Sequence, residues 1–285
     1  MPCGLRANTL SPRFLGIEMK RILGATIAFA ASAAFAGAAH GETRVGFYTG
    51  LDYSSGDYGT ANTTEVWSVP LAVRVAHGAW SVRASIPYLQ ISGNGAVADV
   101  IDGGAQGPTT VTRSGTERGF GDTSLSLTRT FSDVVGHGTY LDVTGRVRLP
   151  TGDDNKGLGV GATDYALGGE LGVTKNGGGA YINMARRFLG DPSGQDRVDG
   201  WQGVVGGYVK TSEHFSIGAS YFWRDASFRG GENPSELGAY VTYRASSDWR
   251  VTLNASAGLS NGSPDESIGL RFNYRPNFRP GPRPQ

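Results

Sequence analysis

From Thr43 onward the chain alternates apolar residues with small or polar ones, and this period of two constrains its fold more than any other feature. Successive side chains of a β-strand point to opposite faces, so the alternation predicts strands with one apolar and one polar face. Each alternating unit ends in a turn rich in Gly, Ser, Asn or Asp. The clearest unit alternates Trp249, Val251, Leu253, Ala255, Ala257 and Leu259 with Arg250, Thr252, Asn254, Ser256, Gly258 and Ser260.

About twelve such units follow one another, which predicts an all-β chain with an even number of antiparallel strands. Their connections alternate between short turns, as at His77-Gly78 and Ser212-Glu213, and longer loops, of which 93–118 is the longest. This alternation is typical of a transmembrane up-and-down β-barrel with both termini on the short-turn side. The expected strands span 43–52, 64–76, 79–92, 119–132, 138–150, 163–174, 180–189, 200–211, 214–225, 236–246, 248–260 and 266–274.

Tryptophans recur near the expected strand ends, where the rings of a membrane barrel meet the two lipid–water interfaces. A soluble β-sandwich is the main alternative fold, but it has no need of this placement. A helical membrane protein fits poorly, because no run of about 20 apolar residues follows Gly41. Pro70 and Pro87 fall inside adjacent strands on the polar face and are expected to mark bulges. The tryptophans are Trp67, Trp80, Trp201, Trp223 and Trp249.

Residues 1–41 are expected to be a leader and signal peptide. Met19-Lys20-Arg21 gives a positive start and residues 22–35 a small-residue apolar core, with cleavage favoured near Glu42 and Met19 as the probable first residue. A membrane anchor is the alternative. The remaining chain has 22 basic and 24 acidic residues and no cysteine, since Cys3 lies in the leader. Nucleic-acid binding through bulk charge, disulfides and thiol chemistry are therefore excluded.

The last expected strand carries a second signal within the barrel segment 42–274. Residues 267–274 follow the pattern polar, x, Gly, x, x, aromatic, x, aromatic, in which Gly269 is the glycine and Phe272 and Tyr274 are the two aromatic residues. This order resembles the β-signal read by the outer-membrane assembly machinery of the Gram-negative envelope. The signal normally ends a chain, whereas here a Pro-rich tail, 275–285, follows it.

Two stretches resemble the outer-membrane family of phenol meta-cleavage (MetA) pathway transporters. They are Gly119-Phe120-Gly121-Asp122-Thr123-Ser124-Leu125-Ser126-Leu127 and Arg148-Leu149-Pro150-Thr151-Gly152-Asp153, and the second continues to Thr163-Asp164-Tyr165. The segment Ser85-Ile86-Pro87-Tyr88 is similar too. The resemblance spans nearly the whole chain after the leader, and it implies an outer-membrane barrel.

Enzyme chemistry has little support in the sequence, and no cofactor is expected. A barrel lipase, deacylase or protease needs a nucleophile with a positioned histidine, but His77, His137 and His214 all fall in or beside short turns. No histidines have metal-ligand spacing, no glycine run has the Lys and Ser/Thr of a P-loop, and the oxygens of 153–155 do not match a calcium loop. A structural or adhesive barrel is the more serious alternative to a channel.

A channel for passive passage of small solutes, anionic or aromatic, is the leading interpretation, with outer-membrane lipid as its surroundings. Strands that run away from the periplasm begin there, and strands that run toward it end there. The position of a residue along its strand therefore gives the height of each lumen-facing charge above the periplasmic side. Only Asp142 among the lumen acids comes near the low cations, while Glu170 is expected near mid-height. Loop 93–118 is expected to be the only segment long enough to constrict the mouth. The expected basic ring comprises Arg44, Arg74, Arg83, Lys210, Arg244, Arg250 and Arg271.

Overall fold

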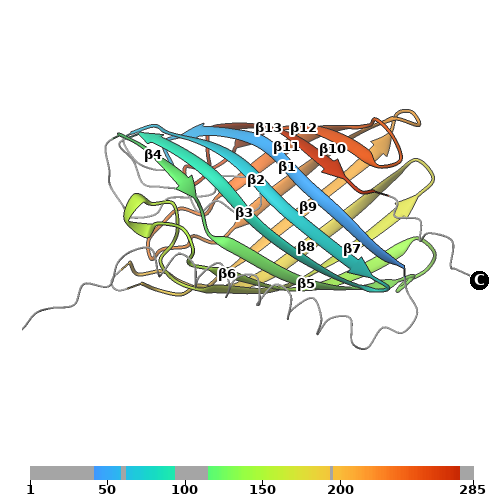
Figure 1. Ribbon diagram of the computed structural model, residues 1–285, viewed down its shortest axis with the longest axis horizontal. Helices are drawn as coiled ribbons and strands as arrows, with labels where there is room; N and C mark the ends of the chain where they lie inside the picture. Colours follow the sequence, from blue (N-terminus) through green and yellow to red (C-terminus); the bar gives the residue numbers. More distant parts are fainter. Residues whose placement is uncertain (1–41, 59–61, 94–114, 193–194, 277–285) are drawn as a thin grey trace, which may run out of the picture.

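The computed structural model describes residues 42–58, 62–93, 115–192 and 195–276, which form one closed antiparallel β-barrel (Figure 1). The expected leader, 1–41, the tail from residue 277 onward and residues 94–114 of the longest loop lie outside the described residues. The elements are β1 (Thr43–Gly56), β2 (Thr64–His77), β3 (Trp80–Gly93), β4 (Gly115–Phe120), β5 (Thr123–Ser132), β6 (Thr139–Leu149), the short 3-10 helix η1 (Asp154–Lys156), β7 (Asp164–Lys175), β8 (Gly178–Phe188), β9 (Gly200–Lys210), β10 (Phe215–Arg224), β11 (Ser235–Arg244), β12 (Trp249–Gly258) and β13 (Glu266–Tyr274).

Except for β4, which pairs only with β3, each strand pairs with the strand on either side of it in the wall, and β13 closes the barrel by pairing with β1 from Phe47↔Tyr274 to Ser55↔Glu266. Because β4 and β5 both pair with β3, they occupy one position in the wall, so the thirteen strands make twelve positions. The predicted twelve-strand up-and-down barrel is confirmed. The pairing of β13 with β1 joins the first and last strands, as a membrane-spanning sheet requires.

The strand expected over 119–132 is broken, because a β-bulge separates β4 from β5. Tyr88 of β3 pairs with Phe120, whereas Ser85 pairs with Ser124, so three residues of one strand face two of the other. The Gly121 N–H donates to the Pro87 carbonyl at 2.8 Å within this bulge. The register of β2 on β3 continues unchanged through Pro70↔Pro87, so the bulge expected at Pro70 is absent. Pro87 does mark a bulge in the wall, but the extra residue lies in the strand opposite it.

The two faces of the wall differ as the alternation predicts. Leu71, Val205 and Leu253 on the outer face are 41%, 49% and 50% exposed, although they are apolar. A closed sheet with an apolar outer band is stable when hydrocarbon covers that band, so the barrel spans a membrane. The five tryptophans lie within four residues of strand ends, as expected for interfacial rings. Among the described residues, no helix is long and apolar enough to cross a bilayer.

The two ends of the barrel differ in their connections. At one end, here called the short-turn end, the strands join through brief turns such as 78–79 and 176–177, and both ends of the described barrel lie there. His77, His137 and His214 lie in or beside these turns, as predicted. The opposite end, here called the long-loop end, carries the longer connections, among them 150–163 and 225–234. By the usual arrangement of such barrels the short-turn end faces the periplasm.

Candidate functional site: the barrel lumen

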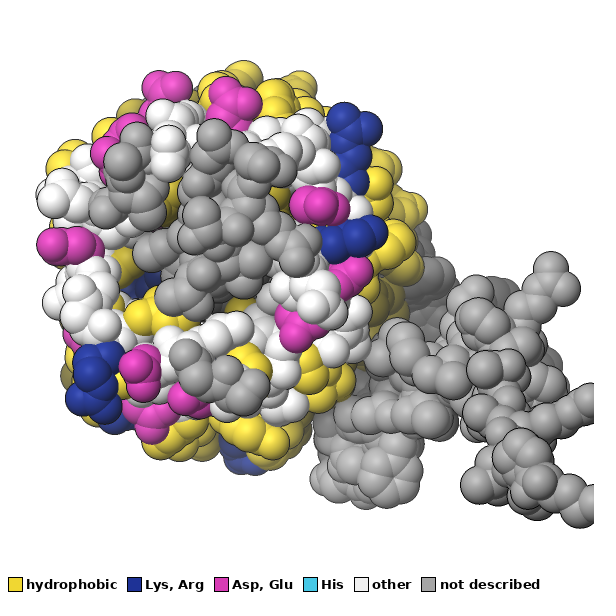
Figure 2. All heavy atoms as spheres, turned by 90° about the vertical axis from the view of Figure 1, so that its left-hand side faces the viewer, with side chains coloured by type: hydrophobic (Ala, Val, Ile, Leu, Met, Phe, Trp, Pro, Cys, Tyr) yellow, Lys and Arg dark blue, Asp and Glu magenta, His cyan; other side chains and the backbone are white. Residues whose placement is uncertain are grey.

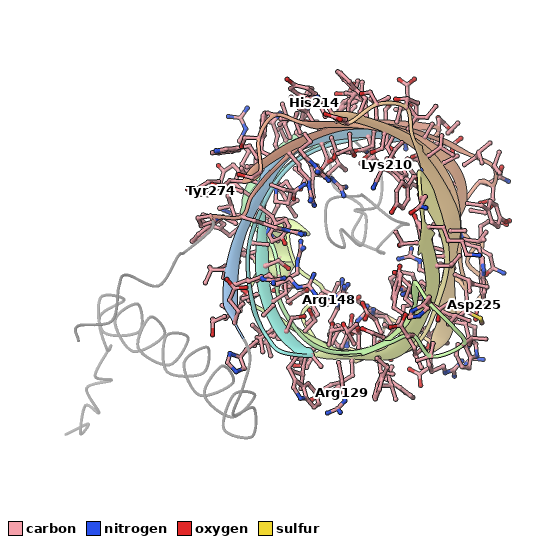
Figure 3. All side chains as sticks on the ribbon, turned by 90° about the vertical axis from the view of Figure 1, so that its right-hand side faces the viewer. Arg129, Arg148, Lys210, His214, Asp225 and Tyr274 are labelled. Atoms are coloured by element: carbon pink, nitrogen blue, oxygen red, sulfur yellow. The ribbon has the colours of Figure 1, made fainter. Side chains whose placement is uncertain are left out.

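All seven residues of the expected basic ring lie on the inner face in the half of the barrel nearer the short-turn end. Arg74 pairs directly with Arg83 across β2 and β3, and Arg244 pairs directly with Arg250 across β11 and β12. Figure 3 looks in from this end and shows Lys210 on the inner side of the wall, with Arg129 and Tyr274 on the outer side. The seven residues differ, however, in their bonding.

Four of the seven are engaged by neighbouring groups. The Arg44 guanidinium contacts the Glu42 carboxylate at 3.0 Å, and Arg74 donates to the Ser81 hydroxyl at 2.9 Å. Arg83 lies over the Tyr48 ring at 5.0 Å, and Arg271 Nε lies 3.5 Å from Asp52 Oδ1. A carboxylate thus offsets the charge of Arg44 and of Arg271, whereas these contacts of Arg74 and Arg83 are with neutral groups.

The other three, Lys210, Arg244 and Arg250, line one cavity of about 330 Å³ at the short-turn end. No acidic group of the described residues forms an ion pair with any of them. Arg244 and Arg250 are direct cross-strand partners, an arrangement in which like charges destabilise a sheet. Glu213 also lines the cavity but pairs with none of the three cations, so the cations outnumber the acid there and the cavity has a net positive charge.

Four lumen tyrosines lie flat against the wall in the same half of the barrel. Each is directly opposite a glycine of the next strand, and a Cβ at that glycine would overlap the tyrosine ring or its hydroxyl. One example is Gly179, where a Cβ would come within 2.8 Å of Tyr208 Cε1. Flat rings keep the centre of the lumen clear. The pairs are Tyr140–Gly172, Tyr181–Gly206, Tyr208–Gly179 and Tyr240–Gly218.

Two lumen acids, Asp142 and Glu170, are direct partners across β6 and β7. They therefore share one height, so the expected difference in height between them was wrong, although Glu170 does lie near the middle of β7. The Tyr140 hydroxyl donates to Glu170 at 2.8 Å. Both acids lie on strands that do not line the basic cavity, so they leave its charge in place.

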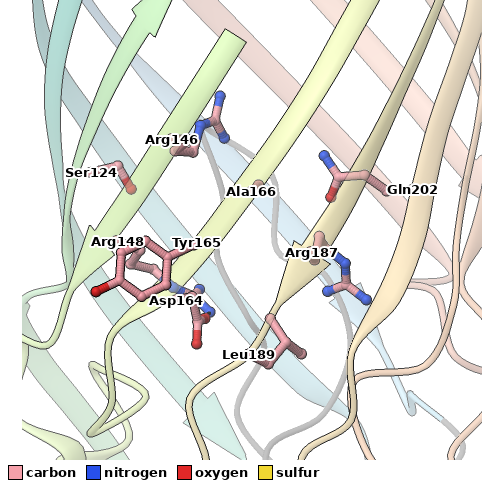
Figure 4. A pocket seen from close by; sticks show the side chains of 9 residues that line it. All are labelled: Ser124, Arg146, Arg148, Asp164, Tyr165, Ala166, Arg187, Leu189 and Gln202. Carbon is pink, nitrogen blue, oxygen red and sulfur yellow. Dashed lines mark hydrogen bonds and ion pairs between the residues drawn. The ribbon is translucent and has the colours of Figure 1, made fainter.

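At the long-loop end, by contrast, lumen arginines are buried and bonded (Figure 4). Asp164, at the start of β7, contacts both Arg148 of β6 and Arg197 of the loop before β9. Arg197 Nη1 donates to Asp164 Oδ1 at 2.7 Å and to the Gly190 carbonyl at 2.7 Å. Arg187 donates to the Asp225 carbonyl at 2.8 Å, and so ties β8 to the loop after β10. These arginines hold loops to the wall.

A second contact holds loop 150–163 inside the mouth. The bulge turns Asp122 inward, where its two carboxylate oxygens accept the N–H groups of Gly152 and Val160, each at 2.9 Å. Leu158 of this loop packs in a buried apolar cluster with Val66, Leu89, Ile91 and Tyr58. The expectation that only loop 93–118 could narrow the mouth was therefore wrong, since a shorter loop folds inward. Burial raises the pKa of Tyr58 to about 12, which keeps its hydroxyl neutral.

The rim of the long-loop end is acidic in the described residues. Figure 2 looks onto this end and shows acidic side chains recurring around the rim. Basic side chains on the described loops of this rim are fewer and include Lys156 and Arg229. The described acids here are Asp57, Glu65, Glu117, Asp153, Asp154, Asp191, Asp196, Asp199, Asp225, Glu232, Asp265 and Glu266. The barrel thus carries charges of opposite sign at its two ends.

The residues of the expected assembly signal lie on β13. Phe272 and Tyr274 face outward at the short-turn end, where the Tyr274 ring stacks on Trp249 at 4.7 Å between centroids. Gly269 faces inward, and a Cβ there would overlap the Asp52 carboxylate. The rings are therefore available to lipid or to a protein that receives the strand during assembly.

Sequence reasoning missed two parts of this interior. Arg197 stands in a loop without periodicity, so nothing local indicates that it reaches Asp164. The flat tyrosines had a signal, a Tyr opposite a Gly, but that signal is readable only once the strand register is known. Among the described residues, no group of three His, Cys, Asp or Glu side chains is placed to hold a metal ion.

No protein-family model matches the chain, and no curated protein matches it by sequence. Its fold is similar to that of the COG4313 outer membrane channel from Pseudomonas putida F1, at 12% identity and a TM-score of 0.59 over 82% of this chain and 95% of that one. It is also similar to the KdgM porin, at 5% identity and a TM-score of 0.50 over 80% of this chain and 98% of that one. The chain therefore has the fold of an outer-membrane channel.

Proposed function

We propose that this protein is an outer-membrane channel for the passive passage of small solutes and that it prefers anions. The observation that carries the proposal is the group of three lumen cations, Lys210, Arg244 and Arg250, which line one cavity without an acidic partner among the described residues. Unpaired charge of one sign in a narrow lumen raises the local concentration of counter-ions and selects them. Both structural relatives bear the names of channels, which supports the same function.

The finer assignment to the phenol meta-cleavage transporter family is part of this proposal. The two stretches that resemble the family contact each other: the Gly152 N–H donates to Asp122, and the Thr123 and Thr151 hydroxyls lie 2.9 Å apart. Asp164, from the continuation of the second stretch, contacts Arg148. These contacts give the two stretches one structural role, which is to hold loop 150–163 to the wall, and they do not identify a solute.

The test is the reversal potential of the purified protein in planar bilayers under a KCl gradient. We expect an anion preference that falls when Lys210, Arg244 and Arg250 are all replaced by Ser. Arg271 is left in place, because Asp52 already lies beside it. Arg129→Ser is the matched control, since this cation lies at the same end but on the outer face, over the Trp80 ring at 4.9 Å.

Three results would count against the proposal. Cation preference, or unchanged selectivity in the triple variant, would refute the role of the three cations. Absence of any conductance from correctly folded protein would favour the alternative of a structural or adhesive barrel.

A further inference from the structure

We propose that the cavity beside Lys210, Arg244 and Arg250 is a binding site for a small organic acid that joins one carboxylate to a flat, apolar body. This inference rests on the proposed channel function and names the solute class that the channel would favour. The cavity is bounded by β9, β10, β11, β12 and the turn between β9 and β10. Its wall has a charged part and an aromatic part.

The charged part suits a carboxylate. Arg244 and Arg250 face each other across the ladder, and Lys210 lies across β10, opposite Ser216, which in turn pairs with Thr242. A guanidinium presents parallel N–H donors that match the two oxygens of a carboxylate. An anion between the two arginines would also relieve the repulsion that their positions impose. Glu213, in the turn at the cavity edge, forms no ion pair with the three cations.

The aromatic part suits a flat apolar body. Tyr208 and Tyr240 line the same cavity, and each lies against the glycine opposite, Gly179 and Gly218 respectively. With one ring face against the wall, each tyrosine turns the other face toward the lumen. Aromatic rings stabilise other flat rings through offset or edge contacts. A solute with both groups would therefore contact both parts at once.

The size of the cavity limits the solute to one small molecule. Its volume of about 330 Å³ lies at the lower end of the range of about 300–1,000 Å³ usual for small-molecule sites. Ser216 and Thr242 pair at the height of Lys210, between the level of the two arginines and that of the tyrosines, and Thr242 Oγ1 is already bonded to Thr252 Oγ1 at 2.9 Å. An extended polyanion would fill only a fraction of its contacts here.

The test is block of the chloride current by benzoate, acetate and benzamide in planar bilayers. We expect benzoate to interrupt the current at a concentration about five-fold or more below that of acetate, because acetate lacks the ring. Benzamide has the ring without the charge and should leave the current unchanged. Replacing both tyrosines, Tyr208→Leu with Tyr240→Leu, should raise the half-blocking concentration of benzoate about ten-fold and leave that of acetate unchanged.

Two further variants separate binding from folding. Tyr140→Leu removes a flat lumen ring outside the cavity and should leave benzoate block unchanged. Tyr208→Phe with Tyr240→Phe keeps the rings, so benzoate should block this variant at the same concentration as it blocks the unaltered protein. Equal block by benzoate and acetate in an anion-selective channel would overturn this inference and leave the proposed function intact. If no current flows, the proposed function fails, and absent benzoate binding by NMR of the detergent-solubilised protein would overturn the site as well.

Discussion

At the long-loop end Arg148 and Arg197 both contact Asp164, whereas at the short-turn end Arg244 faces Arg250 and no described acid pairs with either. Arg197 is 7% exposed, and its Nη1 and Nη2 groups donate to a carboxylate and a carbonyl. At the short-turn end, Lys210, Arg244 and Arg250 border a cavity instead. The same residue type therefore stabilises loops at one end and is open to a solute at the other. Bonding partners, rather than charge, separate the two uses.

The largest expected effect concerns the outer face of the barrel at the short-turn end, where aromatic rings pack against each other. Phe272→Ala with Tyr274→Ala should sharply lower the amount of assembled barrel, because these rings complete the proposed insertion signal and Tyr274 stacks on Trp249. Heat-modifiable gel migration of outer-membrane fractions measures assembly. Val241→Ala, on the same outer face, is the control. Normal assembly of the double variant would mean that the signal match is accidental.

The next largest effect is expected from the loss of Asp164, the acid that Arg148 and Arg197 share at the long-loop end. Asp164→Asn removes the carboxylate that the buried Arg148 and Arg197 share, which should lower the free energy of unfolding by about 3–5 kcal/mol. Urea unfolding in detergent micelles measures this, and anion selectivity should not change. Asp153→Asn is matched to it, because its partner Lys156 lies 4.0 Å away at the surface and such pairs contribute about 0–1 kcal/mol. An equal decrease in the free energy of unfolding of the two variants would show that the Asp164 pairs do not stabilise the long-loop end more than a surface pair does.

A smaller effect is expected where the long-loop end holds its inward loop. Asp122→Ala removes the acceptor of two backbone N–H groups, so loop 150–163 should become accessible to protease and unfolding should become easier by about 2 kcal/mol. Limited proteolysis followed by mass spectrometry locates the cuts. Asp142→Ala, an inward acid that holds no loop in the described structure, should leave the loop resistant. Protection of the loop in the Asp122 variant would mean that Leu158 alone suffices to hold it.

The smallest effect separates the ends by their response to salt. Anion preference should weaken as KCl rises, because the Debye length shrinks to about 3 Å at 1 M and the lower cations face water. The buried pairs of Asp164 are screened much less, so the unfolding free energy should change little over the same range. Reversal potentials and urea curves at matched salt concentrations compare the two. Selectivity that does not vary with salt would show that the preference comes from pore size.

How far the sequence predicts this molecule depends on whether a feature is local. The alternation predicted the strands well, and β13 has the predicted bounds of 266–274, because side-chain period is a local property. Strand direction then placed the low cations at one end. The bulge at Gly121 and the contact of Arg271 with Asp52 depend on pairing between strands, the latter on the closure of β13 against β1. The register of a strand pair cannot be predicted from the sequence of either strand alone.

The glycine beneath each lumen tyrosine also bears on how such a channel can evolve. A barrel changes its diameter in large steps when it gains or loses a hairpin. Here a methyl group at Gly172 or Gly206 would first meet the ring or hydroxyl of Tyr140 or Tyr181, would push that ring away from the wall and toward the axis, and would narrow the bore without altering strand number. Single substitutions at these glycines therefore offer a fine adjustment of solute size, on a scaffold whose assembly stays the same.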